Sequence, residues 1–210
     1  MTTLYADALW ESPWVFSALV ALEEKRVPYR TQVLDLDRGE QRDPDYVSRT
    51  LTARVPTLEH DGFFLGESKA IIEYLEEVFP APDHPRLLPS DLRQRARARQ
   101  ILGWLRTDLL ALRKERPSST LFFSPATEPM SDHARGEAGK LVRVASELVR
   151  SATATIFDEW SIADAELAFA LQRLVVNSEP VPEPLAGYVA AQWSRPSVRA
   201  FVDQPRPTKH

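Results

Sequence analysis

The chain has 210 residues, enough for one or two domains with a substantial buried core. Its 30 acidic and 26 basic side chains give a formal net charge of -4, which provides no overall attraction to nucleic acid or anionic lipid. Cysteine is absent, which excludes disulfides, thiolate metal sites and a cysteine nucleophile, so any thiol must come from a substrate. No segment approaches the ~18 apolar residues of a membrane span, and we expect a cytoplasmic protein.

The N-terminal part of the chain alternates strand-like and helix-like segments. A short apolar run at residues 4–6, followed by apolar positions at helical spacing, predicts a first strand and helix. Alternation over residues 29–36 predicts a second strand. The dipeptide Asp61-Gly62 between two apolar runs is typical of a hairpin, and the helical stripe after it stops at Pro80. This β-α-β-α-β-β-α order is that of a thioredoxin-like domain.

Prolines at 80, 82, 85 and 89 follow this segment, and proline disrupts both helix interiors and sheet ladders. Beyond residue 90 the strand signals vanish and helical periodicity takes over. The sequence therefore predicts an α/β domain followed by an all-α helical bundle: a thioredoxin-like domain over 1–80, a linker over 81–90 and a helical domain over 91–210.

The helical domain contains one clear capping signal. Ser161 can cap a helix, and Asp164 three positions later can bond back, a capping box with aspartate in place of the usual glutamate. Helices are predicted over 92–115, where Pro117 ends a single long helix, over 135–150, from 161 onward, and around 183–192 and 197–202.

Ser12-Pro13 stands where the first strand leads into the first helix. Serine before proline is a common helix start, because the hydroxyl caps the helix and proline lacks a donor that would be unpaired. The same hydroxyl and the helix amides can instead stabilise a substrate thiolate. Lowering a thiol pKa of ~8.5 by ~2 units needs ~2.7 kcal/mol, within reach of one charge-assisted hydrogen bond and a helix N-terminus. Both interpretations stay open.

Two further dipeptides fit a peptide-like ligand. A cis bond at Pro56 would expose the backbone of Val55 as a strand edge for an extended peptide, although such bonds are usually trans. At a helix start, Glu67 can take an ammonium group and Ser68 a carboxylate, although both residue types are also ordinary there. An amino-acid head group carries both charges.

These motifs resemble the glutathione site of the glutathione S-transferase family. The resemblance rests on Val55-Pro56, Glu67-Ser68 and the continuation Ala70-Ile71-Ile72-Glu73-Tyr74-Leu75, and Ser161-Ile162-Ala163-Asp164 resembles the capping box of that family's helical domain. It covers essentially the whole chain. The segments 95–101, 104–106, 115–117 and 192–193 make the chain most similar to the bacterial YfcF-type members.

The resemblance implies glutathione as co-substrate and assigns a role to each matching residue. Ser12 would stabilise the thiolate, Val55 would pair with the cysteinyl backbone, and Glu67 with Ser68 would hold the γ-glutamyl end. The glycyl carboxylate would be approached by Gln41, Arg42 and Arg54, and the structural residues would be Pro56, Ser161 and Asp164.

Ser12-Pro13-Trp14 has the spacing of the Cys-Pro-aromatic motif of omega-type members, with serine in place of cysteine. Whether the hydroxyl or the backbone amides contact the sulfur therefore stays open. A second-substrate pocket is expected between the domains, with Trp10, Trp14 and Trp104 as candidates; core packing explains these aromatic residues equally well.

We therefore expect a glutathione transferase that acts in detoxification on a small hydrophobic electrophile, with glutathione-dependent peroxidase activity as a second function. A non-catalytic interaction module and a glutathione-dependent isomerase are the alternatives. The intact Ser12, Glu67 and Ser68 count against the module, and the missing Ser-Ser-Cys start of zeta-type isomerases counts against the isomerase.

The family resemblance also implies a twofold homodimer. The arginine-rich start of the helix at residue 92 and the acidic residues Glu73, Glu76 and Glu77 suggest complementary faces. The histidines at 60, 84, 133 and 210 show no ligand spacing, so we expect no metal site. Neither nucleic acid nor a membrane is expected as a partner.

Overall fold

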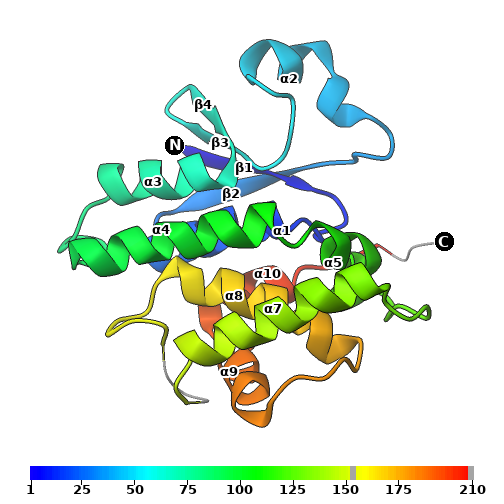
Figure 1. Ribbon diagram of the computed structural model, residues 1–210. Coiled ribbons are helices and arrows are strands. Elements are labelled where there is room, and N and C mark those ends of the chain that lie inside the picture. The colour runs from blue at the N-terminus through cyan, green and yellow to red at the C-terminus, as the bar shows by residue number, and fades with distance from the viewer. Residues whose placement is uncertain (152–154, 208–210) are drawn as a thin grey trace. The chain divides into compact units, whose positions relative to one another are not determined.

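The computed structural model describes residues 1–151 and 155–207, which form two compact units (Figure 1). The first unit comprises residues 1–87 together with 196–207, and the second comprises the described residues between 88 and 195. The sequence assigned the segment after Pro196 to the helical domain. It packs on the first unit instead, because α10 (Pro196–Val202) lies against α1 (Pro13–Lys25).

A four-stranded sheet forms the centre of the first unit. Its strand order is β2-β1-β3-β4, with β1 and β2 parallel and both β3 and β4 joined by antiparallel pairing. Parallel neighbours need a crossover, which α1 supplies between β1 and β2. The strands are β1 (Thr2–Asp7), β2 (Tyr29–Leu34), β3 (Thr57–His60) and β4 (Phe63–Gly66). This arrangement confirms the predicted thioredoxin-like fold.

Helix α1 is the core of the first unit. Its apolar residues from Val15 to Leu22 are almost completely buried, since α3 (Ser68–Val78) and α10 both pack against it. Helix α3 buries Ile71, Ile72 and Leu75 on one face, as the sequence stripe predicts. Between β2 and β3 the chain forms a short 3-10 helix (Glu40–Arg42) and α2 (Pro44–Arg49), which carries the buried Tyr46.

The second unit consists of helices in the part that the structure describes. Helix α8 is its most buried element, packed by α4, α6, α7 and α9. The helices are α4 (Leu92–Thr107), α5 (Leu110–Glu115), α6 (Ser119–Phe122), α7 (Asp132–Leu148), α8 (Ile162–Val176) and α9 (Glu183–Trp193). None of the helices in residues 1–151 and 155–207 combines the length and apolarity that crossing a membrane requires.

The prediction of a single helix over 92–115 is wrong, because the chain leaves the helical path between α4 and α5. Leu109 takes a non-helical conformation and buries its side chain. The N–H of Leu112, in the first turn of α5, then donates to Glu137 on α7 at 2.8 Å. Burial of Leu109 and this bond to α7 thus accompany an interruption that no proline or glycine in the sequence marks.

Candidate functional site

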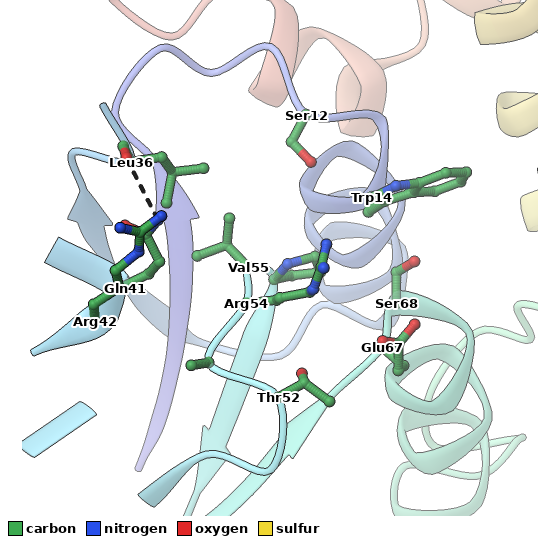
Figure 2. A pocket seen from close by; sticks show the side chains of 12 residues that line it. Ser12, Trp14, Leu36, Gln41, Arg42, Thr52, Arg54, Val55, Glu67 and Ser68 are labelled. Atoms are coloured by element: carbon green, nitrogen blue, oxygen red, sulfur yellow. Dashed lines mark hydrogen bonds between the residues drawn. The ribbon is translucent and has the colours of Figure 1, made fainter. Parts of the chain in front are cut away.

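One pocket of the first unit, with a volume of about 650 Å³, gathers the residues predicted to bind glutathione (Figure 2). Its volume is in the range typical of small-molecule sites. Ser12 lies at one side of the pocket, Gln41 and Arg42 at a second, and Glu67 and Ser68 at a third. The lining residues are Ser12, Trp14, Leu36, Gln41, Arg42, Thr52, Ala53, Arg54, Val55, Pro56, Glu67 and Ser68. Sequence reasoning missed Leu36, Thr52 and Ala53, which carry no chemical signal of their own.

Ser12 is the N-cap of α1, with Pro13 as the first helical residue. Its Oγ accepts a hydrogen bond from the Val15 N–H at 3.3 Å. A hydroxyl oxygen that accepts one bond keeps its own proton for another partner. The cap and the proposed contact with a thiolate are therefore compatible, and the two interpretations of Ser12 do not exclude each other.

The buried carboxylate of Asp7 holds the turn that leads to Ser12. It is only 4% exposed, and it accepts hydrogen bonds from the N–H groups of Glu11 at 2.9 Å and of Ser12 at 3.4 Å. Burial raises the pKa of Asp7 in spite of these two donors. The Ser12 N–H thus points to Asp7. Sequence reasoning missed this residue, for which the only signal is an acid at the end of a strand.

Hydrogen bonds to the Arg54 carbonyl oxygen fix the segment that carries Arg54 and Val55. The Tyr46 hydroxyl lies 2.8 Å from the Arg54 carbonyl oxygen, and the Thr57 hydroxyl donates to the same oxygen at 2.8 Å. The Val55-Pro56 peptide bond is cis, and Pro56 is buried. Tyr46 was also missed from sequence, because a tyrosine on a short surface helix gives no sign of a partner eight residues away.

Glu67 and Ser68 lie at the N-terminus of α3. Glu67 is the exposed N-cap residue with φ of 64°, a conformation that non-glycine residues adopt rarely. Ser68 opens the helix and is 2% exposed. A helix N-terminus favours anions, so this corner suits a group that carries both a carboxylate and an ammonium.

Gln41, Arg42 and Arg54 supply the polar and basic part of the pocket. Both arginines are exposed, and the Gln41 amide nitrogen donates to the Leu36 carbonyl at 3.4 Å (Figure 2). The Gln41 Oε1 atom is enclosed and accepts no hydrogen bond from the described residues. Because this oxygen is closed off from solvent, the two exposed arginines are the groups that a ligand can meet at this side.

The three predicted second-substrate tryptophans belong to two different units, and each has its own surroundings. Trp14 lines the pocket, and its ring extends away from the other labelled side chains (Figure 2). Trp10 is 4% exposed and packs edge-to-face against Phe201 in the core of the first unit. Trp104 belongs to the second unit, where its indole N–H donates to Asp108 at 2.9 Å. Among residues 1–151 and 155–207, no three acidic, histidine or cysteine side chains are grouped as a metal site.

Family models match both units of the chain. A model described as glutathione S-transferase, N-terminal domain, matches residues 11–78, and one described as glutathione S-transferase, C-terminal domain, matches residues 91–205. Together they span most of the chain, and the pocket lies within the N-terminal match.

Solved structures show the same fold. A glutathione transferase homolog from Burkholderia gl BGR1 with bound glutathione is 37% identical over 96% of both chains, with a TM-score of 0.77. A maleylacetoacetate isomerase from Methylobacterium extorquens AM1 with bound malonate and glutathione is 27% identical, covering 98% of this chain and 100% of that one, with a TM-score of 0.72.

Curated relatives match over shorter stretches. A maleylacetoacetate isomerase from Dictyostelium discoideum is 36% identical over 113 residues, which is 53% of this chain and 49% of that protein. A human glutathione S-transferase theta-2 is 36% identical over 78 residues, or 37% of this chain and 31% of that protein. The chain thus spans about half or less of the length of these curated relatives.

Proposed function

The chain belongs to the glutathione S-transferase family, and from this membership we propose that it binds reduced glutathione and transfers the thiolate to an electrophilic small molecule. The observation that carries the proposal is the pocket itself. It brings the Ser12 hydroxyl, a helix N-terminus with an adjacent carboxylate, and two arginines to one cavity from four separate segments.

The γ-glutamyl end of glutathione fits the corner formed by Glu67 and Ser68. The Glu67 carboxylate pairs with the ligand ammonium, while Ser68 at the start of α3 takes the ligand α-carboxylate. At the other side of the pocket, Arg42 and Arg54 attract the glycyl carboxylate, and Gln41 lies beside them. Val55 between these ends pairs with the cysteinyl backbone.

The thiolate rests on Ser12. The Ser12 hydroxyl donates to the sulfur while its oxygen keeps the bond from Val15. Within this turn the Ser12 N–H is directed to Asp7, the Val15 N–H to Ser12, and Pro13 has none, so the hydroxyl is the group of Ser12 that remains for the sulfur. The thiol proton passes to solvent, and the thiolate attacks an electrophilic carbon. A thioether bond forms as a leaving anion departs or, at an activated double bond, as the neighbouring carbon takes up a proton.

Further properties of the protein are also proposals: its secondary activities, its subgroup, its location and its assembly. The same thiolate also reduces peroxides, so we retain peroxidase activity and detoxification as secondary expectations. Membership of the YfcF-type subgroup, a cytoplasmic location and a homodimer remain predictions from the sequence.

Glutathione-dependent isomerisation is the second candidate function. The Dictyostelium relative and a 41% identical protein of Pseudomonas aeruginosa are both described as maleylacetoacetate isomerases. Isomerisation begins with the same thiolate but releases glutathione unchanged. An assay of maleylacetoacetate turnover that follows free thiol distinguishes the two, since only transfer to carbon consumes the thiol.

Calorimetric titration with glutathione tests the binding site. We expect Glu67→Ala to weaken binding by ~2–4 kcal/mol, roughly 30- to 900-fold, because the ligand ammonium, which covers the exposed Glu67 carboxylate when bound, loses its charged partner. Asp83→Ala is the matched control, since Asp83 is an exposed acid of the same unit outside the pocket, and its affinity should equal that of the wild type. Equal affinity of the Glu67 variant would place the γ-glutamyl group elsewhere.

A further inference from the structure

The segment that follows α10 contacts the turn over residues 7–12 and holds it in place. Within the turn, Trp10 has φ of 49° and its N–H donates to the Asp7 carbonyl at 3.1 Å. This leaves the carbonyl of Trp10, two residues before Ser12, as the group that faces the later segment.

Arg206 contacts that carbonyl with two of its nitrogens. Its Nε and Nη2 atoms donate to the Trp10 oxygen at 3.2 Å and 2.9 Å. Its Nη1 atom donates to the carbonyl oxygens of Val202 at 2.7 Å and Gln204 at 3.0 Å. One planar guanidinium thereby connects the turn before Ser12 with the C-terminal end of α10.

Aromatic packing reinforces the same connection. The Phe201 ring meets Trp10 edge-on at 5.8 Å between ring centroids and meets Phe16 of α1 at 5.4 Å. The Arg206 guanidinium lies over the Phe201 ring at 5.6 Å. The charged groups that face Arg206 are Asp7, Glu11 and Asp203, all acidic, while burial lowers its pKa. At neutral pH it remains charged.

We propose that Arg206 is a positioning residue for Ser12: its paired bonds to the Trp10 carbonyl fix the turn over 7–12 so that the Ser12 hydroxyl meets the thiolate. This inference rests on the proposed function. A shift of about 1 Å in a reacting geometry costs on the order of 100-fold in rate, so a turn released by a few tenths of an ångström already has a measurable effect.

The position of Arg206 separates this role from general support of the pocket. The remaining glutathione contacts come from Gln41, Arg42 and the segments 52–56 and 67–68, none of which Arg206 touches through the bonds described above. Loss of the arginine should therefore affect the sulfur more than the two charged ends of glutathione. Lysine does not replace it, because a point-like ammonium cannot bridge carbonyls of two segments in one plane.

The test compares wild type, Arg206→Gln and Arg206→Lys, with Arg199→Gln as control. Arg199 is an exposed arginine of α10 that pairs with Asp203, so its loss removes the same charge from the same segment without touching the turn. Calorimetry with S-methylglutathione, which has no free thiol, reports the peptide contacts. Ultraviolet absorbance of bound glutathione against pH reports the thiolate, and steady-state kinetics with 1-chloro-2,4-dinitrobenzene report turnover.

We expect both Arg206 variants to raise the pKa of the bound thiol by about one unit and to lower kcat/KM about 10-fold at neutral pH. Their affinity for S-methylglutathione should stay within about twofold of the wild type, and Arg199→Gln should match the wild type throughout. An unchanged thiol pKa in Arg206→Gln overturns the inference. Parallel loss of S-methylglutathione affinity in both variants also overturns it, since Arg206 would then support the whole unit. Failure of the wild type itself to bind S-methylglutathione contradicts the proposed function instead.

Discussion

In the proposed function the Ser12 hydroxyl has two partners, the Val15 N–H of its own helix and the sulfur of bound glutathione. Each role uses a different part of the group, because the oxygen accepts and the proton is donated. An N-cap hydroxyl typically contributes ~1 kcal/mol to stability, whereas a hydrogen bond to a charged sulfur contributes ~1.5–3 kcal/mol. The larger effect of removing it should therefore appear in thiol chemistry.

Ser12→Ala should raise the pKa of bound glutathione by ~1 unit or more and lower kcat/KM roughly 10-fold or more, since one unit corresponds to 1.36 kcal/mol. Binding itself should change less. Titration of the thiolate absorbance in wild type and variant checks this, with Ser12→Thr as the control that keeps a hydroxyl. Coincident titration curves with equal rates would show that Ser12 is only a helix cap and that other groups hold the sulfur.

At the scale of single elements, α8 shows how one side chain fixes a helix start. The fully buried Asp164 carboxylate accepts hydrogen bonds from the N–H groups of Ser161 at 2.9 Å and Ile156 at 2.8 Å, and from the Tyr188 hydroxyl at 3.0 Å. Burial nevertheless raises the pKa of Asp164. The folded chain then holds this proton more tightly than the unfolded chain, so this contribution to stability is greatest at low pH and falls as the pH rises through the folded pKa.

Asp164→Asn should destabilise the protein by about 1–3 kcal/mol, because an amide offers one acceptor where the carboxylate offered two. The variant also has no titratable side chain at position 164, so it lacks this pH-dependent contribution to stability. The difference in free energy of unfolding between wild type and variant should therefore be larger at pH 4 than at pH 7. Denaturant unfolding at both pH values measures it. A difference that grows with pH would mean that the three donors lower the pKa of Asp164 below that of the unfolded chain.

At the scale of the whole molecule, the proposed homodimer depends on surfaces of both units. Glu76 is engaged within its own chain, by Lys25 at 2.6 Å and by the Leu87 N–H at 2.9 Å, so the expected charge complementarity rests on fewer groups than the sequence suggested. Exposed apolar residues also offer surface for a contact between chains: Phe63 on β4 is 51% exposed and Leu92 at the start of α4 is 75% exposed.

Sedimentation should show a species of about 48 kDa, twice the 23.8 kDa mass of one chain, at micromolar concentration. Phe63→Glu should increase the fraction of single chains if β4 contributes to the contact, because the substitution places a charge on an apolar interface. A wild-type species of 23.8 kDa at that concentration would contradict the dimer.

The sequence by itself determined the elements whose signals are local. The apolar stripe of α3, the Asp61-Gly62 hairpin and the Ser12-Pro13 helix start each depend on residues only a few positions apart, and all three stand where the sequence placed them. The pocket residues also came from short motifs. Ser12-Pro13 and Glu67-Ser68 lie at strand-to-helix boundaries, and Val55-Pro56 lies just before β3, so local signals define each position.

The tertiary structure alone decided the contacts that close the site. Arg206 contacts Trp10, and α10 packs with the first unit. The helical path is interrupted at Leu109, where neighbours distant in sequence offer burial and a hydrogen bond. The Val55-Pro56 bond belongs here too, since cis and trans forms differ locally by only ~0.5–1 kcal/mol. Differences of that size are settled by packing, which depends on residues that meet only after the chain has folded.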